Sequence, residues 1–148
     1  MQTITVKRTI KAPIDRVFEV LGNHEGYTDL PGMSIARLER PGRKERNGEG
    51  AVRYLKSGPA WFREEITVFE RPQRMDYLIV GSLLPLEHQG ASIRLKETGE
   101  GTEVSWTSTF RVRVPVVGGV LTRLLAKEMS KGFGGALKHI DRKLSTGR

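Results

Sequence analysis

Cysteine is absent from the 148 residues, which excludes a disulfide framework, a thiolate metal site and a thiol nucleophile. Aromatic residues are scarce at 7%, and none alternates with lysine as a base-stacking platform for nucleic acid requires. No apolar run approaches the roughly 20 residues that a membrane-spanning helix needs. The composition is therefore that of a soluble globular protein.

Positive charge, in contrast, is in excess. The 25 lysine and arginine residues outnumber the 17 aspartate and glutamate residues and give a net charge of +8. Such an excess favours an anionic partner, either nucleic acid or an acidic membrane surface. The basic residues are scattered, and their densest stretch, residues 37–46, also contains two glutamates. Nucleic-acid binding is therefore not favoured, and an anionic membrane surface is kept as a candidate partner.

Length and the N-terminal pattern indicate a single cytoplasmic domain. A chain of 148 residues, 37% hydrophobic and 28% charged, suits one domain spanning residues 1–148 with one sizeable core. The N-terminal string MQTITVKRTIKA alternates polar and apolar residues and lacks the continuous apolar segment of a signal peptide. The sequence therefore predicts a strand there and a cytoplasmic location.

Periodicity and turn signals predict the order strand, two short helices, six strands, long helix. Residues 2–11 alternate as a strand, Pro13 opens a short helix, and a second short helix ends at Pro31-Gly32. The six further strands are predicted at residues 33–40, 50–57, 60–70, 74–82, 88–97 and 102–114. Their short connections imply antiparallel neighbours.

The long C-terminal helix needs a surface on which to bury its apolar stripe. A seven-stranded antiparallel sheet curls because its strands twist, and its concave face is the one surface large enough. The predicted fold is therefore α+β, a curved seven-stranded antiparallel sheet wrapped around the C-terminal helix. We expect a cavity between sheet and helix.

Three glycines interrupt that helix, whose apolar stripe runs from Val116 to about Leu144. Gly132, Gly134 and Gly135 each cost roughly 1 kcal/mol relative to alanine in a helix interior. Two interpretations are open. The helix either breaks near Gly132, or it stays continuous and turns Gly132 or Gly135 toward the concave face to leave room for a guest.

Several strings, in their order along the whole chain, resemble a known superfamily. They are IKAPIDRVFEVL, YTDLPG, EEITVFERPQRMDYLIVGSLLPLEHQG and GTEVSWTSTF, followed by the terminal helix. The chain resembles the START-related SRPBCC superfamily of helix-grip proteins, which includes birch-pollen-allergen-type proteins, polyketide cyclases and dehydrases, and lipid-transfer domains. LPLEHQG and GTEVSWTSTF are similar to bacterial polyketide-cyclase-like members. The resemblance implies a cavity for hydrophobic small molecules, and it supplies no shared catalytic triad to carry over.

Strand alternation predicts which side chains face the C-terminal helix. Val52 and Val68 are placed inside, and so is Glu64, where a carboxylate has a raised pKa or a buried partner. Glu64 is then either a ligand anchor or general base, or the partner of Arg53 or of a rim arginine. The residues expected to bind a ligand are Tyr54, Phe62, Glu64, Tyr77, Ile79, Trp106, Phe110, Met129 and Phe133.

The three histidines, His24, His88 and His139, lack metal-ligand spacing, so no metal site is expected, and no cofactor motif is present. His88 follows Pro85 near a sheet edge, either on the surface or within reach of a ligand as acid or base. His24 is expected to serve helix capping and turn formation, and His139 to be solvated.

The first functional hypothesis is carriage or sensing of a hydrophobic small molecule such as a lipid, quinone or aromatic polyketide. The alternative is a polyketide cyclase or dehydratase in which Glu64, His88 and Tyr77 supply acid–base groups, although no nucleophile with an adjacent base is visible. The oligomeric state is left open. A third hypothesis is docking on an anionic membrane or on an acidic protein. It rests on a positive outer helix face formed by Arg123, Lys127, Lys131, Lys138, Arg142 and Lys143.

Overall fold

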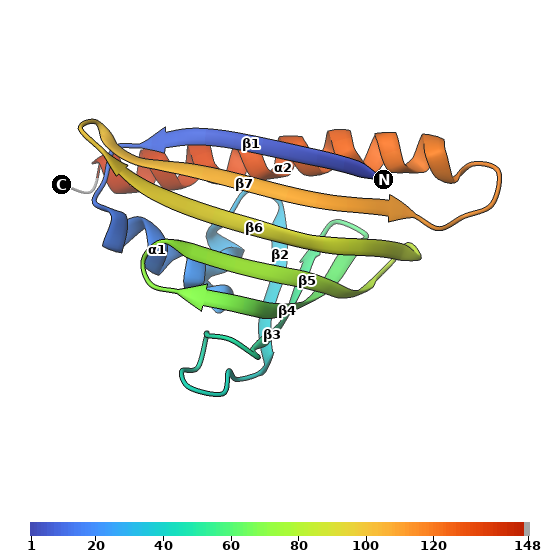
Figure 1. Ribbon diagram of the computed structural model, residues 1–148, viewed down its shortest axis with the longest axis horizontal. Helices are drawn as coiled ribbons and strands as arrows, with labels where there is room; N and C mark the ends of the chain where they lie inside the picture. The colour runs from blue at the N-terminus through green and yellow to red at the C-terminus, as the bar shows by residue number, and fades with distance from the viewer. Residues whose placement is uncertain (147–148) are drawn as a thin grey trace.

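The structure, a computed structural model, describes residues 1–146. Its elements are β1 (Gln2–Ile10), α1 (Ile14–Gly22), the 3₁₀ helix η1 (His24–Asp29), β2 (Met33–Arg40), β3 (Val52–Ser57), β4 (Ala60–Glu70), β5 (Arg74–Ser82), β6 (Leu86–Thr98), β7 (Gly101–Val112) and α2 (Gly118–Thr146) (Figure 1). Among these residues no helix is both long enough and apolar enough to cross a membrane.

All seven strands form one antiparallel sheet in the order β1-β7-β6-β5-β4-β3-β2. Consecutive antiparallel connections join β2 through β7, and the last strand, β7, pairs with the first strand, β1. The two short helices α1 and η1 therefore connect the opposite edge strands, β1 and β2, across the width of the sheet (Figure 1). The predicted helix-grip architecture is confirmed, with α2 lying along β1 and β7.

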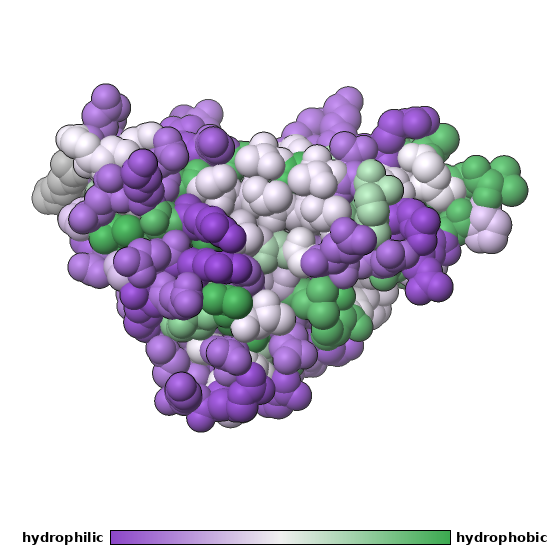
Figure 2. All heavy atoms as spheres, viewed as in Figure 1, coloured by the Kyte–Doolittle hydropathy of each residue, from purple (hydrophilic) through white to green (hydrophobic). Residues whose placement is uncertain are grey.

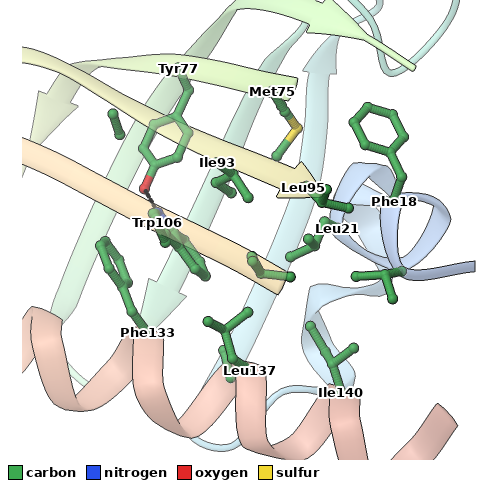
Figure 3. Packing of buried hydrophobic residues seen from close by; sticks show 14 of the residues in the cluster. Phe18, Leu21, Met75, Tyr77, Ile93, Leu95, Trp106, Phe133, Leu137 and Ile140 are labelled. Carbon is green, nitrogen blue, oxygen red and sulfur yellow. Dashed lines mark hydrogen bonds between the residues drawn. The ribbon is translucent and has the colours of Figure 1, made fainter. Parts of the chain in front are cut away.

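The core lies between the concave face of the sheet, α1 and α2 (Figure 3). Apolar side chains alternate along β5, β6 and β7 as predicted, and α2 adds a stripe that includes Leu137 and Ile140, which are essentially unexposed. On the other side, α1 buries Phe18 against Phe69 with ring centroids 5.1 Å apart. Burial of each such side chain stabilises the fold by roughly 1.5–3 kcal/mol.

The turn between β6 and β7 requires a glycine at position 101. Gly101 has φ +140°, and a Cβ there would lie 2.2 Å from the carbonyl oxygen of Ile10. Only glycine fits both the backbone angle and this close approach. The hairpin thereby sets the register in which Thr102 opposes Glu97 and Trp106 opposes Ile93.

Two of the predicted strand faces are wrong. On β3 it is Arg53 and Leu55 that point into the core, so Tyr54 lies on the opposite face, where it stacks on Trp61 with centroids 5.9 Å apart. On β4 a register shift between Ile66 and Val68 changes the alternation. Phe69, which pairs with Met75, faces the core instead of Val68.

The glycines do not break α2, which is one continuous helix from Gly118 to Thr146. The residue that faces the sheet is Phe133, whose ring stacks on Trp106 at 4.0 Å. A Cβ on Gly132 or Gly135 would meet nothing within 4 Å, so the prediction that one of them faces the sheet is wrong. At 100° per residue Gly132 and Gly134 point about 100° to either side of Phe133, and Gly135 points nearly opposite to it.

Candidate functional site

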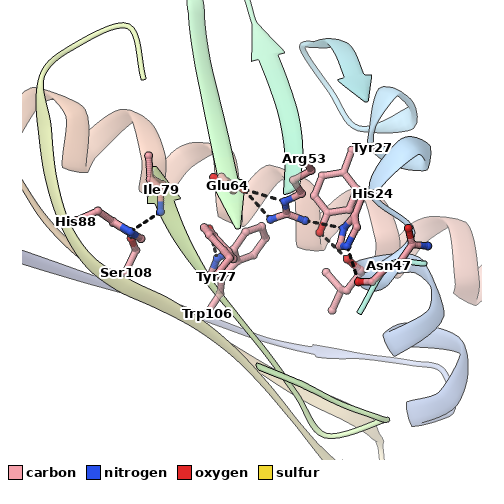
Figure 4. A network of polar contacts seen from close by, with 11 residues as sticks. His24, Tyr27, Asn47, Arg53, Glu64, Tyr77, Ile79, His88, Trp106 and Ser108 are labelled. Carbon is pink, nitrogen blue, oxygen red and sulfur yellow. Dashed lines mark hydrogen bonds and ion pairs between the residues drawn. The ribbon is translucent and has the colours of Figure 1, made fainter. Parts of the chain in front are cut away.

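A buried ion pair lies on the concave face where β3 and β4 run side by side (Figure 4). Arg53 and Glu64 are direct cross-strand partners and are 1% and 5% exposed. The Nε and Nη2 atoms of Arg53 lie 2.9 and 2.8 Å from Oε1 of Glu64. Burial raises the pKa of Glu64, and the guanidinium opposes that shift. The alternative in which Arg53 is the partner of Glu64 is therefore the one observed.

Two tyrosines and a histidine complete the surroundings of the Arg53 guanidinium. Its central carbon lies 4.8 Å from the ring centroids of both Tyr27 and Tyr77, a cation–π contact on each. Its Nη1 atom donates to Nδ1 of His24 at 3.1 Å, and Nε2 of His24 donates to the carbonyl oxygen of Asn47 at 2.8 Å. Since Nδ1 accepts, His24 must be neutral and protonated on Nε2.

Electrostatics support this protonation state. Burial, together with the charge of Arg53, lowers the pKa of His24 to about 3. His24 is fully buried, so its expected role in capping gives way to a role inside the core. The capping oxygen belongs instead to the Asn23 side chain, which accepts from the amide of Gly26.

Tyr77 and Trp106 extend this set of buried polar side chains toward α2. The set, named here the polar row, consists of His24, Tyr27, Arg53, Glu64, Tyr77 and Trp106. Nε1 of Trp106 donates to the hydroxyl oxygen of Tyr77 at 3.0 Å, and Phe133 covers the indole. Burial raises the pKa of Tyr77, so its hydroxyl keeps a proton that it can donate. The neighbouring Glu64 accepts both of its Arg53 bonds on Oε1, and neither bond reaches Oε2.

His88 occupies the place where β5 and β6 separate. The β5–β6 ladder ends at Tyr77 and Ala91, and beyond it Nδ1 of His88 accepts from the amide of Ile79 at 2.9 Å. Its Nε2 atom then donates to Oγ of Ser108, also at 2.9 Å. Burial lowers the pKa of His88 to about 4. At neutral pH this imidazole is therefore a neutral bridge between strands, and it has no proton to give as an imidazolium acid.

The structure brings most of the predicted site residues to one place. The three candidate acid–base groups lie on the concave face, with the ring of Tyr77 stacked on that of His88 at 6.2 Å and close to Arg53 and Glu64. The predicted residues that line this face or cover it are Phe62, Glu64, Tyr77, Ile79, Trp106, Phe110, Met129 and Phe133. Tyr54 is excluded because it lies on the opposite face.

Sequence reasoning named Arg53 as a possible partner of Glu64 but missed His24 and Tyr27 as members of this site. The parity of Glu64, which opposes Arg53 directly, is the signal that pointed to the arginine. Nothing local in the sequence indicated the other two. His139, expected to be solvated, is half-buried and hydrogen-bonds Asp29 at 3.0 Å. No group of three potential ligands for a metal ion occurs within residues 1–146.

Comparisons with known proteins agree with this architecture. The profile of a family described as "Polyketide cyclase / dehydrase and lipid transport" matches residues 1–144, and no curated protein matches significantly. A START superfamily protein from Mycobacterium smegmatis superposes with a TM-score of 0.79 at 12% identity, over 99% of both chains. The Zhui aromatase/cyclase from Streptomyces sp. R1128 gives 0.78 at 20% identity, over 97% of this chain and 93% of that one. At these identities the structural likeness shows the fold alone.

Proposed function

The chain belongs to the polyketide cyclase/dehydrase and lipid-transport family, and from this membership we propose that it binds a hydrophobic small molecule. We place its site between the concave face of the sheet and the N-terminal half of α2. The family and its fold support a role of this general kind, either ligand binding or cyclase-type. The cytoplasmic location expected from the sequence is part of the same proposal.

Unused hydrogen-bonding capacity on a buried face is the observation that carries the proposal. The hydroxyl of Tyr77 accepts from Trp106 and retains its own proton, while Oε2 of Glu64 receives neither Arg53 bond. The Tyr77 proton suits an acceptor on a guest, and the Glu64 oxygen that Arg53 does not bind suits a donor. A carbonyl and a hydroxyl on an apolar framework, as in an aromatic polyketide or a quinone, meet that requirement.

Apolar side chains at one end of the concave face offer the way in. Phe62 and Leu86 on the sheet, and Leu125 and Met129 on α2, are only partly buried although each packs against the core. Ligand sites are typically apolar with a few polar groups that fix orientation. A guest entering between these four side chains would place its framework against Phe133 and its polar end near Tyr77.

A cyclase- or dehydratase-type reaction is the second candidate, favoured by the gathering of Glu64, Tyr77 and His88 on one face. In that case Tyr77 would donate to a ketone oxygen, and Oε2 of Glu64 would take the proton from the adjacent carbon. The charge of Arg53 lowers the pKa of Glu64 against the effect of burial, and this makes Glu64 a weaker base than burial alone would. Multiple turnovers of a poly-keto substrate, lost in Glu64→Gln, would establish the reaction, whereas stoichiometric binding without turnover would assign carriage.

The binding proposal is tested with a pair of probes, a dihydroxyanthraquinone and anthracene, which share a framework but differ in polar groups. Tyr77→Phe should weaken binding of the quinone by roughly ten-fold, the value of one net hydrogen bond, and leave anthracene unchanged. Tyr54→Phe is the matched control, since Tyr54 lies on the opposite face. Equal affinity of wild type and Tyr77→Phe for the quinone, measured by titration calorimetry, would refute the anchoring role of Tyr77.

A further inference from the structure

The start of α2 and the loop before it carry an exposed apolar patch, named here the apolar tip. It consists of Val116, Val117, Val120 and Leu124, which are 102%, 47%, 50% and 56% exposed. Figure 2 shows hydrophobic side chains gathered at this end of the molecule, where β7 runs into α2 and the chain protrudes beyond the sheet (Figure 1). A gathering of this kind, unlike a single exposed leucine, marks a surface that contacts something apolar.

The neighbouring turn extends the same surface. The amide of Arg113 donates to the carbonyl oxygen of Pro85 at 2.8 Å, which fixes the β5–β6 turn beside the loop that leads into α2. That turn carries Leu83, which is 53% exposed. Two separate segments of the chain therefore present large apolar side chains at one end.

The backbone of Val116 is strained. Its φ of 70° lies in the left-handed region, which a β-branched residue rarely adopts. Such outliers cost of order 1–3 kcal/mol and persist where the surroundings or a function hold them. Val116 is fully exposed, so the packing of its side chain in the folded chain does not offset the strain.

Basic residues lie close to the apolar tip along the chain. From Arg111 to Lys131 the chain contains five basic residues, Arg111, Arg113, Arg123, Lys127 and Lys131, and one acidic residue, Glu128. Beside the tip is an open hollow of about 500 Å³ that Arg111, Arg113 and Arg123 help to line. Arg111 is neutralised by Glu87, with which it forms an ion pair. Arg113 and Arg123 are exposed, so they add positive charge to the rim.

We propose that the apolar tip docks this protein on an anionic lipid bilayer, with its valines and leucine in the acyl boundary and Arg113 and Arg123 at the lipid phosphates. An apolar surface with a basic border is what such a bilayer attracts, through area burial and surface potential together. A second copy of the chain is a poorer occupant because a two-fold contact would place basic border against basic border. A protruding tip also suits a fluid layer, which adapts to its shape.

Docking in this manner would place the partly buried side chains Phe62, Leu86, Leu125 and Met129 near the bilayer. Leu86 and Leu125 belong to the same end of the molecule as the tip, since Leu86 opposes Val112 at the end of β7 and Leu125 follows Leu124. The proposal nevertheless stands apart from the interior site. Vesicle binding is measured without any small-molecule guest, so either idea can fail alone.

The test is co-sedimentation of the full chain with vesicles of phosphatidylcholine, with and without phosphatidylglycerol. We expect binding to the anionic vesicles that falls steeply with added salt. Val117→Ser/Val120→Ser/Leu124→Ser should lower partition roughly 100-fold. Arg113→Ser/Arg123→Ser should lower it roughly 20-fold on anionic vesicles only. Lys96→Ser/Lys138→Ser, exposed lysines far from the tip along the chain, remove the same charge and serve as the control.

Val116→Gly separates docking from folding. Glycine accepts the positive φ, so this variant should melt at the same or a higher temperature while losing roughly ten-fold in vesicle partition. Equal partition on neutral and anionic vesicles would overturn the proposal, as would full binding by both Val116→Gly and the triple variant. A concentration-dependent dimer that the triple variant abolishes, without vesicle binding by the wild type, would overturn it in favour of a second copy.

Discussion

Acidification from pH 7 to pH 5 should destabilise this protein through His24. The side chain is fully buried, and its Nδ1 atom lies 3.1 Å from a nitrogen of the Arg53 guanidinium. A proton on Nδ1 would remove that hydrogen bond and place two positive charges side by side. For this reason the pKa of His24 falls from 6.5 to about 3 in the fold. The unfolded chain takes up the proton near 6.5, so the stability that neutral His24 contributes is present above that pH and is lost as the pH falls toward 3.

The magnitude follows from the two pKa values. Between pH 7 and pH 5 the unfolded state gains about 0.7 proton at His24 and the folded state gains almost none, which integrates to a loss of about 2 kcal/mol. His88, whose pKa burial lowers to about 4, acts in the same direction. It is partly exposed, so we assign it about 1 kcal/mol. A loss of about 3 kcal/mol is a large part of a typical stability of about 5–15 kcal/mol.

Other titrating groups act in different windows or in the opposite direction. The pKa values of Asp29, Glu39, Asp76 and Asp141 are lowered by hydrogen bonds and nearby positive charges, in opposition to any burial. Their contributions are present above the unfolded carboxyl pKa and are lost only below about pH 4. The raised pKa of Glu64 works in the opposite sense, because a buried carboxyl gains a proton more readily in the fold. A comparison of variants is needed to isolate His24.

Urea unfolding at pH 7, 6 and 5 makes that comparison. His24→Gln keeps an amide that can accept from Arg53 and donate to Asn47, but it does not titrate. The variant should lose about 2 kcal/mol less than the wild type between pH 7 and pH 5, whatever its stability at pH 7. His88→Gln should reduce the loss by the smaller amount. If His24→Gln and the wild type show the same dependence on pH, the assignment of a neutral His24 bound to Arg53 is refuted.

Three further predictions concern the stability of other parts of the fold. Gly132→Ala should raise the free energy of unfolding by a few tenths to about 1 kcal/mol, since Gly132 lies in a continuous helix with open space around its Cα, and a thermal melt gives the sign. Gly101→Ala, with φ +140° and a Cβ clash on Ile10, should instead destabilise in the same assay. Arg53→Met leaves Glu64 buried without its partner and should cost about 3–5 kcal/mol in urea, most of it recovered in Arg53→Met/Glu64→Leu. A double variant no more stable than the single one would show that the pair does not account for the loss.

The sheet and the long helix could be predicted from the sequence because they depend on local patterns. Strong period-two alternation in β5, β6 and β7 assigned Tyr77, Ile93 and Trp106 to the core, and the structure buries all three. Turn residues at each hairpin set the antiparallel order. These signals need no knowledge of distant contacts.

The polar row could be predicted only in part because it depends on distant partners. On β3 the residues Val52 and Tyr54 look more apolar than Arg53, and hydrophobic parity alone selects the wrong face. Arg53 can be buried because Glu64 on β4 pairs with its charge, His24 on η1 accepts a hydrogen bond from it, and the rings of Tyr27 and Tyr77 contact the guanidinium. A guanidinium can occupy a core only when such partners converge, and only the tertiary fold reveals that convergence. The register shift on β4 that turns Val68 away from the core also escaped prediction, since a bulge cannot be recognised from the alternation of apolar residues.

The central claim, a guest bound against the concave face, is tested most directly by the fluorescence of Trp106. The chain has two tryptophans, and Trp61 lies on the opposite face against Tyr54. Trp61→Phe therefore leaves Trp106, bonded to Tyr77 and stacked on Phe133, as the single reporter of the interior. Titration of this variant with a dihydroxyanthraquinone should quench that emission in a saturable, one-to-one manner. Emission that stays constant while calorimetry records binding would contradict the claim, because the guest would then lie elsewhere on the protein.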